Sequence, residues 1–413
     1  MIYDVSVIGL GYIGLPTAAM FASRKLRVIG IDINETAVET INRGEIHIVE
    51  PDLDQAVHSA VTDGFLHAST SPAPAKAFLV AVPTPFRGTE RQPDLSYVQA
   101  AARTIAPVLQ KESLVVLEST SPVGATEQLA EWLAHERPDL SFPQNAGENA
   151  DVRIAYCPER VLPGKVMHEL IENDRVIGGM TAKCSAAAVK LYKTFVKGDC
   201  IVTNARTAEM VKLTENSFRD VNIAFANELS LICDKLDVDV WELISLANRH
   251  PRVNILRPGP GVGGHCIAVD PWFIVSRTPE EAKIIRTARE VNDAKPDWVV
   301  AKVTEAANRI SNPSIICMGL AFKPDIDDLR ESPALSIATE IASRQLGTVT
   351  VCEPFVAELP KELSERGVAK VAEPAVSDAD IVVFLTAHSQ FCNLAGKISS
   401  SATVIDACGV LAQ

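Results

Sequence analysis

The stretch that decides the fold is Val5-Ser6-Val7-Ile8-Gly9-Leu10-Gly11-Tyr12-Ile13-Gly14, near the N-terminus. An apolar run that predicts a strand leads into three glycines, and a helical pattern follows. Glycines at this spacing allow a tight turn and a close approach to a diphosphate, which the free N–H groups of the helix N-terminus then face. The next apolar run ends at Asp32, whose carboxylate would accept hydrogen bonds from ribose hydroxyls. Because Ile33 and Asn34 follow, with no arginine for a 2′-phosphate, the pattern favours NAD over NADP.

Strand and helix patterns alternate through both ends of the chain. Strands are expected at Val5–Ile8, Arg27–Asp32, Phe78–Val82, Leu114–Leu117 and Ile154–Tyr156, and after Ala294 at Ser314–Gly319, Thr348–Glu353, Ile381–Thr386 and Thr403–Asp406. Such alternation predicts parallel sheets covered by helices on both faces. The segment Pro138–Asp151, rich in Pro, Asn and Gly, is interpreted as a surface loop.

Between these regions, apolar residues recur at helical spacing from Thr207 to about Leu236 without Gly or Pro. A helix of about thirty residues is about 45 Å long, and such helices usually connect domains or form subunit interfaces. The predicted fold is therefore α/β, with two Rossmann-like doubly wound domains joined by a long central helix. We place the divisions at residues 1–200, 201–300 and 301–413.

Composition and charge exclude several classes of protein. The 413 residues are 47% hydrophobic and 22% charged, as in globular proteins. A formal charge of −13 repels polyanions, so we expect no nucleic-acid partner. No apolar run approaches the roughly 18 residues that span a membrane, and we expect no signal peptide before the first strand. Nine cysteines without a Cys-x-x-Cys pair fit a reducing cytoplasm and indicate neither disulfides nor a metal site.

Two motifs suggest reaction chemistry. Glu209, Lys212 and Asn216 share one face of the long helix, where a lysine and an amide could polarise an alcohol or carbonyl oxygen. An exposed i,i+3 ion pair is an equally good interpretation of this triplet. Farther along, Pro258–Cys266 clusters four glycines just before a cysteine, with Asp270 four residues on. Such a cysteine could be a nucleophile if a cation lowers its pKa, although a buried structural thiol is the commoner case.

Three more features lie beside these motifs. His265 could act as a base, but we expect it to orient or pack. Cys157–Gly164 places Glu159 after a proline at the end of a strand. Phe322–Ser332 is dense in charge, and it follows a strand end, where open α/β sheets bind ligands.

In their order along the chain, these segments resemble the UDP-glucose/GDP-mannose dehydrogenase family. The segments are Gly9–Gly14, Asp32, Val82–Pro85, Ser119–Gly124, Glu159, Lys212–Asn216, Gly263–Cys266 and Lys323–Ser332. The resemblance covers essentially the whole chain. It implies oxidation of the C6 alcohol of a nucleotide sugar to a carboxylate, with two NAD⁺ and no release of the aldehyde. It also implies an NAD-binding first domain, a central region for dimerisation that includes the catalytic loop, and a third domain for the nucleotide sugar.

The resemblance assigns catalytic roles to five residues. Cys266 would capture the aldehyde as a thiohemiacetal and then hold a thioester. Lys212 and Asn216 would stabilise the developing oxyanion, and Asp270 would position a water or the lysine. Glu159 would act as general base in hydrolysis of the thioester.

The resemblance also implies binding roles. Cofactor contacts would include Tyr12, Ile13, Thr84, Thr120 and Arg330 beside the glycines and Asp32. Substrate contacts would come from Lys212 and Asn216 together with Arg160, Val161, Arg252, Gly264 and Lys323. Arg252 would reach the substrate of the neighbouring subunit, so we expect a homodimer.

Within the family, Gly263–Phe273 is most similar to the branch that acts on UDP-2-acetamido sugars. The sequence Ala268-Val269-Asp270-Pro271-Trp272 favours UDP-N-acetyl-D-mannosamine over UDP-N-acetylglucosamine or UDP-glucose, and the uronate would fit a bacterial surface polysaccharide. One position departs from the family: many members have an arginine two residues after the final-strand aspartate, where this chain has Cys408. Two other functions stay open, a one-step β-hydroxyacid dehydrogenase and a non-catalytic NAD-binding sensor.

Overall fold

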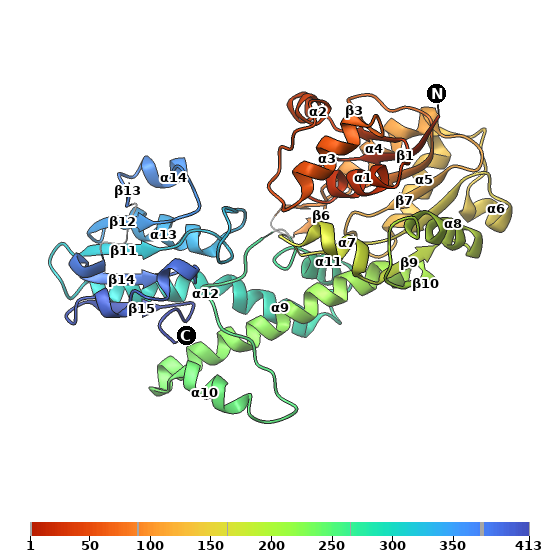
Figure 1. Cartoon of the computed structure of the whole chain (residues 1–413). Helices are drawn as coiled ribbons and strands as arrows, with labels where there is room; N and C mark the ends of the chain where they lie inside the picture. Colours follow the sequence, from red (N-terminus) through yellow and green to blue (C-terminus); the bar gives the residue numbers. More distant parts are fainter. Residues whose placement is uncertain (1, 89–90, 163, 265, 372–375, 413) are drawn as a thin grey trace. The chain divides into compact units, whose positions relative to one another are not determined.

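The computed structural model describes residues 2–88, 91–162, 164–264, 266–371 and 376–412. The chain forms two compact units, Met1–Thr214 and Glu215–Gln413, and the division falls within the long helix α9 (Ala205–Leu236). Figure 1 colours the first unit from red to yellow-green and the second from green to blue. The three-part division drawn from the sequence stays a prediction.

The N-terminal unit is built on one large sheet. Among the described residues it has eight strands in the order β10 (Cys200–Asn204), β9 (Arg175–Gly179), β8 (Arg153–Tyr156), β7 (Leu114–Leu117), β4 (Ala75–Val80), β1 (Tyr3–Ile8), β2 (Val28–Ile31) and β3 (Leu66–Ser69). All neighbours are parallel except β8 and β9, which are antiparallel. The order of connection reverses between β1 and β4, and ligands of open α/β sheets bind at such a point.

Both faces of this sheet are covered. Ala77 and Leu79 of β4 pack into one apolar core, whereas Phe78 and Val80 pack into the other. The helices that complete the unit are α1 (Gly14–Ser23), α2 (Glu35–Asn42), α3 (Leu53–Thr62), α4 (Ser96–Ile105), α5 (Ala125–Glu136), α6 (Pro143–Ala146), α7 (Val166–Glu172) and α8 (Ala182–Tyr192). A strand that is buried on both faces has no polar alternation, which explains its continuous apolar sequence.

The C-terminal unit repeats the doubly wound arrangement. Its described sheet has five parallel strands in the order β13 (Ala369–Lys370), β12 (Thr348–Cys352), β11 (Ser314–Met318), β14 (Ile381–Phe384) and β15 (Thr403–Asp406). Its helices are the C-terminal part of α9, α10 (Val240–Ala247), α11 (Asp270–Arg277), α12 (Lys283–Ala307), α13 (Pro333–Ser343) and α14 (Lys361–Ser364). Here too the connection reverses, between β11 and β14.

The predicted fold class is confirmed, with local corrections. The N-terminal sheet is not wholly parallel, because the β8–β9 connection returns at the edge where β8 ends. Pro138–Asp151 is not all loop, since α6 forms a short helix within it. The second alternation begins with β11 at Ser314, as expected, after α12 has continued through Pro296 to Ala307. No helix of the described chain is both long and apolar enough to cross a membrane.

Candidate active site

The glycine turn after β1 leaves room for a ligand. Gly9 has a φ of +90°, and a Cβ there would lie 2.5 Å from the carbonyl oxygen of Ala81. A Cβ on Gly14 would overlap the carbonyl oxygen of Gly9, so this glycine allows α1 to start close to the strand. A Cβ on Gly11 would meet no atom within 4 Å. The turn is therefore closed on its protein side and open where a diphosphate must approach.

Asp32 is oriented by the same turn. Its Oδ2 accepts a hydrogen bond of 2.8 Å from the amide of Leu10, and its Oδ1 accepts one of 2.9 Å from the amide of Asn34. The side chain is only half-buried. A carboxylate held in this way at the end of β2 can still accept from ribose hydroxyls, so these residues fit NAD.

The other predicted cofactor residues belong to both units of the chain. Thr84 follows β4, Thr120 follows β7, and the Thr84 hydroxyl donates to the Thr120 carbonyl oxygen at 2.5 Å. Tyr12 and Ile13 lie in the glycine turn, and the Tyr12 side chain is 38% exposed. Arg330, in contrast, belongs to the C-terminal unit, where its guanidinium pairs with Asp328 at 2.6 Å.

Glu159 is buried in an ion pair that the sequence did not indicate. Its Oε2 accepts from Nη1 of Arg175 at 2.7 Å, and its Oε1 accepts from the amide of Arg160 at 2.7 Å. The Arg175 guanidinium carbon lies 5.2 Å from the ring centroid of Tyr192. Because β9 runs antiparallel to β8, Arg175 at its start lies beside Glu159, which follows the end of β8. The only signal would have been the direction of β9, and the sequence analysis missed this strand.

A second carboxyl group belongs to the same buried cluster. Burial raises the pKa of Glu118 to about 7, and the negative charge of Glu159 adds to this effect. The Tyr192 hydroxyl donates to Oε1 of Glu118 at 2.5 Å, but Oε2 has no hydrogen-bond partner in the described structure. The predicted substrate residues next to this cluster are partly occupied: Arg160 donates to the Asp174 carbonyl oxygen at 3.1 Å, and Val161 packs against the apolar core.

On α9, Lys212 is not paired with Glu209. The Glu209 carboxylate accepts from the amides of Gly124 and Thr126, at 2.7 and 2.8 Å, and from the Thr126 hydroxyl at 2.6 Å. It thereby satisfies donors at the start of α5. Within the described part of the chain, no Glu209–Lys212 ion pair forms, and the half-buried Lys212 ammonium has no hydrogen-bond partner. This arrangement favours the chemical interpretation of the triplet over the exposed ion pair.

Asn216, one turn after Lys212 on α9, is tied to the cysteine loop. Its Nδ2 donates to Oδ2 of Asp270 at 2.5 Å, and the two side chains are only 7% and 3% exposed. Asp270 begins α11, and its amide donates to the Cys266 carbonyl oxygen at 2.8 Å. In the C-terminal unit, the predicted Asn216, Asp270 and Cys266 therefore form one connected group.

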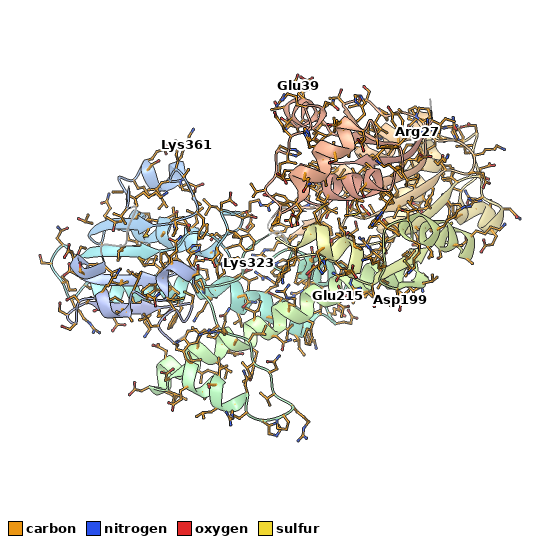
Figure 2. All side chains as sticks on the ribbon, in the orientation of Figure 1. Arg27, Glu39, Asp199, Glu215, Lys323 and Lys361 are labelled. Carbon is orange, nitrogen blue, oxygen red and sulfur yellow. The ribbon has the colours of Figure 1, made fainter. Side chains whose placement is uncertain are left out.

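The glycines before Cys266 pack against the charged segment after β11. The amide of Gly264 donates to the Arg330 carbonyl oxygen at 3.2 Å, and a Cβ on Gly264 would lie 2.9 Å from the Phe322 ring. Cys266 is exposed, which contradicts the interpretation as a buried structural thiol. Burial and the charge of Arg219 lower the pKa of Lys323, labelled in Figure 2, and Cys266 opposes that change. His265 lies outside the described residues.

Two predicted features remain separate from this group. Arg252 is exposed in the loop after α10, and its amide donates to Nδ1 of His250 at 3.3 Å. Cys408 is half-buried in a turn closed by the carboxylate of Asp406, which accepts from the Cys408 amide at 3.2 Å. The Arg257 guanidinium donates to the Gly409 carbonyl oxygen in the same turn, at 3.2 Å.

Comparison with known proteins identifies the family of the whole chain. The chain matches the UDP-glucose/GDP-mannose dehydrogenase family in its NAD binding domain over residues 3–196, its central domain over 206–294 and its UDP binding domain over 316–413. It is 64% identical over 414 residues to UDP-N-acetyl-D-mannosamine dehydrogenase of Escherichia coli K12, covering 98% of each chain. It is 65% identical over 407 residues to NDP-N-acetyl-D-galactosaminuronic acid dehydrogenase of Ralstonia nicotianae, covering 98% of this chain and 96% of the relative.

A solved structure shares the fold over nearly the same length. The UDP-D-ManNAc dehydrogenase of Pyrococcus horikoshii superposes with a TM-score of 0.87 at 39% identity, covering 99% of this chain and 96% of that one. The match thus includes the glycine turn, the long helix and the second doubly wound sheet. Because all three family domains are present in order, the chain belongs to the UDP-glucose/GDP-mannose dehydrogenase family and is an NAD-dependent nucleotide-sugar dehydrogenase.

Proposed function

We propose that this enzyme oxidises the C6 alcohol of UDP-N-acetyl-D-mannosamine to the carboxylate of UDP-N-acetyl-D-mannosaminuronate. The observation that carries the proposal is the buried Asn216–Asp270 hydrogen bond, joined to the backbone of Cys266. Lys212 lies one turn before Asn216 on α9 and has no partner in the described chain. An ammonium and an amide at this spacing can stabilise the negative charge that develops on an oxygen.

The first half of the reaction converts the alcohol to an aldehyde. NAD, when bound, accepts the hydride that leaves C6, and it does so once in each half. Lys212 and Asn216 hold the C6 oxygen while its proton leaves to solvent or to a neighbouring base. Asp270 fixes the orientation of the Asn216 amide, because its carboxylate accepts from Nδ2 at 2.5 Å. The same two donors remain in place for the oxygen of the aldehyde.

The second half takes place on Cys266. The thiolate adds to C6, the carbonyl electron pair moves to the oxygen, and a thiohemiacetal forms. Loss of the hydride from C6 to NAD and of the hydroxyl proton to solvent then gives a thioester. Water adds to the thioester carbonyl, the C6–S bond breaks, and the products are the carboxylate and the free thiol. Glu159 takes the proton of this water, and Arg175 fixes the orientation of its carboxylate.

The assignment of the sugar substrate rests on a short stretch of sequence. Ala268–Trp272 favours N-acetylmannosamine, and the Escherichia coli relative carries that name. N-acetylgalactosamine is the second candidate, because the Ralstonia relative is 65% identical. NADH formation should be measured with UDP-linked N-acetylmannosamine, N-acetylgalactosamine, N-acetylglucosamine and glucose, and with GDP-mannose. The proposal requires two NADH per sugar and the highest kcat/KM for UDP-N-acetyl-D-mannosamine. One NADH per sugar would favour a one-step dehydrogenase instead.

The covalent step has its own test in Cys266→Ser. We expect this variant to reduce the prepared C6 aldehyde with NADH, because Lys212, Asn216 and the NAD-binding unit are unchanged. It should form no uronate, because a serine hydroxyl without a dedicated base is a poor nucleophile. Cys392→Ser removes another exposed thiol and serves as the matched control. Normal uronate formation by Cys266→Ser would exclude the thioester.

We also propose that the enzyme is a homodimer. Phe218, Phe225 and Ile232 repeat every seven residues on α9, and their side chains are 68%, 52% and 45% exposed. An apolar stripe at this spacing is typical of a helix that packs against another copy. If Arg252 completes the partner's site, Arg252→Ala should be inactive alone, but a mixture with Lys212→Ala should regain activity. No recovery in confirmed mixed dimers would contradict the shared site.

A further inference from the structure

The C-terminal unit contains its own acid at the Rossmann position. Glu353 follows β12 as Asp32 follows β2. The amide of Leu320, after β11, donates to Glu353 at 2.6 Å, just as the amide of Leu10, after β1, donates to Asp32 at 2.8 Å. The two doubly wound sheets therefore place a carboxylate at equivalent positions.

Glu353 is saturated by protein groups. Besides Leu320, the amides of Ala321 and Phe355 donate to it at 3.1 and 2.9 Å, and Nε2 of His388 lies 3.2 Å from Oε2. The residue is 1% exposed. Burial raises the pKa of Glu353, but the hydrogen bonds from His388 and the amides outweigh it, and the pKa lies below its ordinary value. This acid thus binds the segment that follows β11.

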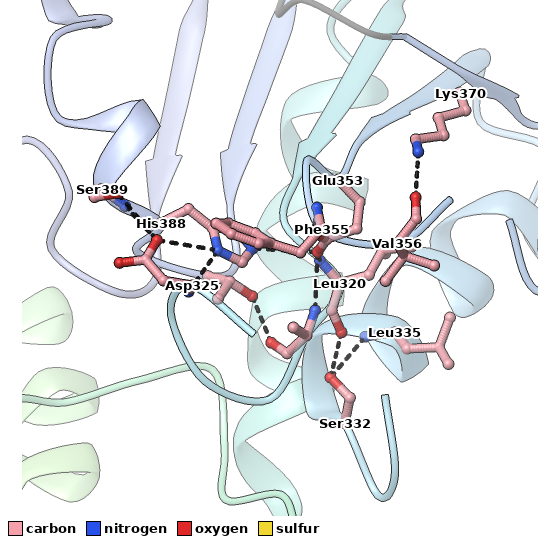
Figure 3. A network of polar contacts seen from close by, with 12 residues as sticks. Leu320, Asp325, Ser332, Leu335, Glu353, Phe355, Val356, Lys370, His388 and Ser389 are labelled. Carbon is pink, nitrogen blue, oxygen red and sulfur yellow. Dashed lines mark hydrogen bonds and ion pairs between the residues drawn. The ribbon is translucent and has the colours of Figure 1, made fainter. Parts of the chain in front are cut away.

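His388 joins this acid to the middle of that segment. Its Nδ1 accepts a hydrogen bond of 2.9 Å from the amide of Asp325, as Figure 3 shows. A ring nitrogen that accepts carries no proton, so in the neutral ring Nε2 carries the hydrogen and donates to Glu353. Oδ1 of Asp325 in turn accepts from the amide and hydroxyl of Ser389, at 2.9 and 3.1 Å. We call Glu353, His388, Asp325 and Ser389 the histidine clasp.

The clasp holds a segment that reaches the cysteine loop. Residues 320–332 begin at the amides bound by Glu353 and include Asp325. The Arg330 carbonyl oxygen accepts from the Gly264 amide, and the Phe322 ring occupies the space where a Cβ on Gly264 would lie. Lys323 lies between Phe322 and Arg330 in the sequence. Lys323 is half-buried, and the charges that act on it include the guanidinium of Arg219 on α9 and Cys266 in its thiolate form. His388 itself faces the carboxylates of Glu353 and Asp325.

We propose that His388 is a positioning residue, which through Glu353 and Asp325 holds Lys323 beside the thiol of Cys266 and so favours the thiolate. This inference rests on the proposed role of Cys266 as nucleophile. A cation next to a cysteine stabilises its charged form, and the thiolate is the reactive species. The side chains of the clasp bind residues 320–332 and are not assigned a contact with the reacting atoms. Their effect on Cys266 is therefore transmitted through Lys323.

The test measures the rate at which iodoacetamide alkylates Cys266 in the full-length enzyme, from pH 6 to 9.5, with the modified peptide identified by mass spectrometry. Lys323→Met removes the cation, and we expect at least about a threefold slower reaction at pH 7.5, with the pH profile moved upward by about half a pH unit. His388→Leu removes both arms of the clasp and should produce the same change. His388→Gln keeps a donor toward Glu353, and His388→Asn keeps an acceptor toward Asp325, so each should recover part of the rate.

Two controls separate positioning from loss of structure. Asp380→Asn weakens the other end of the same sheet, where the carboxylate accepts from the amide and hydroxyl of Ser314, both at 2.8 Å. It should leave the alkylation rate unchanged. Cys352, buried in β12, should stay unlabelled in every variant that is compared. If His388→Leu does not fold, the Gln and Asn variants decide.

Wild-type alkylation rates in the folded His388 variants would overturn the proposal, and so would an equal slowing in Asp380→Asn. A kinetic measurement supplies a second criterion: His388→Gln should lower kcat for uronate formation more than it raises KM for the sugar. The alkylation needs neither sugar nor NAD. The alkylation rates can therefore reject the role of the clasp while Cys266→Ser still supports the thioester. Cys266→Ser can likewise reject the thioester while the alkylation rates support the clasp.

Discussion

Glu118→Gln should change the pH dependence of stability in the N-terminal unit. Burial and the charge of Glu159 raise the pKa of Glu118 to about 7, although the Tyr192 hydroxyl and the charge of Arg175 oppose the rise. The Glu118 side chain is buried, and its Oε2 is among the buried atoms without a partner in the described structure. Glutamine keeps an oxygen for the Tyr192 hydroxyl but cannot ionise, so it removes only the buried charge.

The direction of the change in stability with pH follows from comparing the protonation of Glu118 in the folded and unfolded chains. Below pH 4.5, the ordinary pKa, the carboxyl group is protonated in both, and its contribution to stability is fully present. As the pH rises from 4.5 to about 7, the unfolded chain loses this proton first and the folded chain loses stability. Above pH 7 the loss levels off at about 3.5 kcal/mol, because the two pKa values, 4.5 and about 7, differ by about 2.5 and each unit corresponds to about 1.4 kcal/mol. Between pH 5 and pH 8, the free energy of unfolding of Glu118→Gln should therefore rise by up to about 3 kcal/mol relative to that of the wild type.

Urea unfolding at pH 5 and pH 8 measures this gain, with pulsed hydrogen exchange of the amides of β7 to report on the N-terminal unit. Glu112→Gln is the matched control, because Glu112 lies just before β7 and its side chain is 69% exposed. Its effect should differ between the two pH values by less than about 0.5 kcal/mol. If the difference in free energy of unfolding between Glu118→Gln and the wild type is the same at pH 5 and pH 8, Glu118 does not carry the buried charge on which this prediction depends.

We make three further predictions, which concern residues of both units. Asp32 should make kcat/KM at least about tenfold higher with NAD⁺ than with NADP⁺, about 1.4 kcal/mol, and comparable values would contradict its role at the ribose. Gly11→Ala should keep the wild-type melting temperature without NAD but raise KM for NAD⁺, whereas Gly9→Ala should lower the melting temperature, because only the Gly9 substitution meets backbone atoms. Asn216→Ala should remove the hydrogen bond that Asn216 donates to the buried Asp270 carboxylate, with a loss of about 1–3 kcal/mol in urea unfolding and a lower kcat; an unchanged kcat would exclude Asn216 from the oxyanion site.

The fold could be predicted where short-range patterns control it. The first strand, the glycine turn and α1 are contiguous, and the alternation of buried strands and helices is visible in hydrophobicity alone. The strand β9 was missed although it is buried, because Arg175 at its start and Gly178–Gly179 at its end interrupt the apolar run. Its direction depends on which neighbour it joins, which the local sequence does not specify. The Glu159–Arg175 ion pair was missed for the same reason.

The site could be predicted as a set of residues, but their pairing could not. Helical spacing placed Glu209, Lys212 and Asn216 together, and it allowed a Glu209–Lys212 ion pair. In the structure, Glu209 instead accepts hydrogen bonds at the N-terminus of α5. Its partner Thr126 lies 83 residues away in the sequence. Asn216 and Asp270 were both assigned, yet their bond joins positions 54 residues apart. Chemistry that depends on contacts between distant elements becomes visible only after folding.

The two Rossmann-like sheets show that the same local geometry can serve two purposes. Each places a carboxylate after its second strand and binds an amide that follows its first strand. Asp32 makes two such bonds and is half-buried, so it can still receive ribose hydroxyls. Glu353 receives three amides and His388 and is 1% exposed, so it has no capacity left for a ligand. The difference arises from His388, which occupies the position beside the acid and connects it to the segment that carries Lys323. A Rossmann acid is therefore informative about nucleotide binding only together with its exposure and its remaining hydrogen-bond capacity.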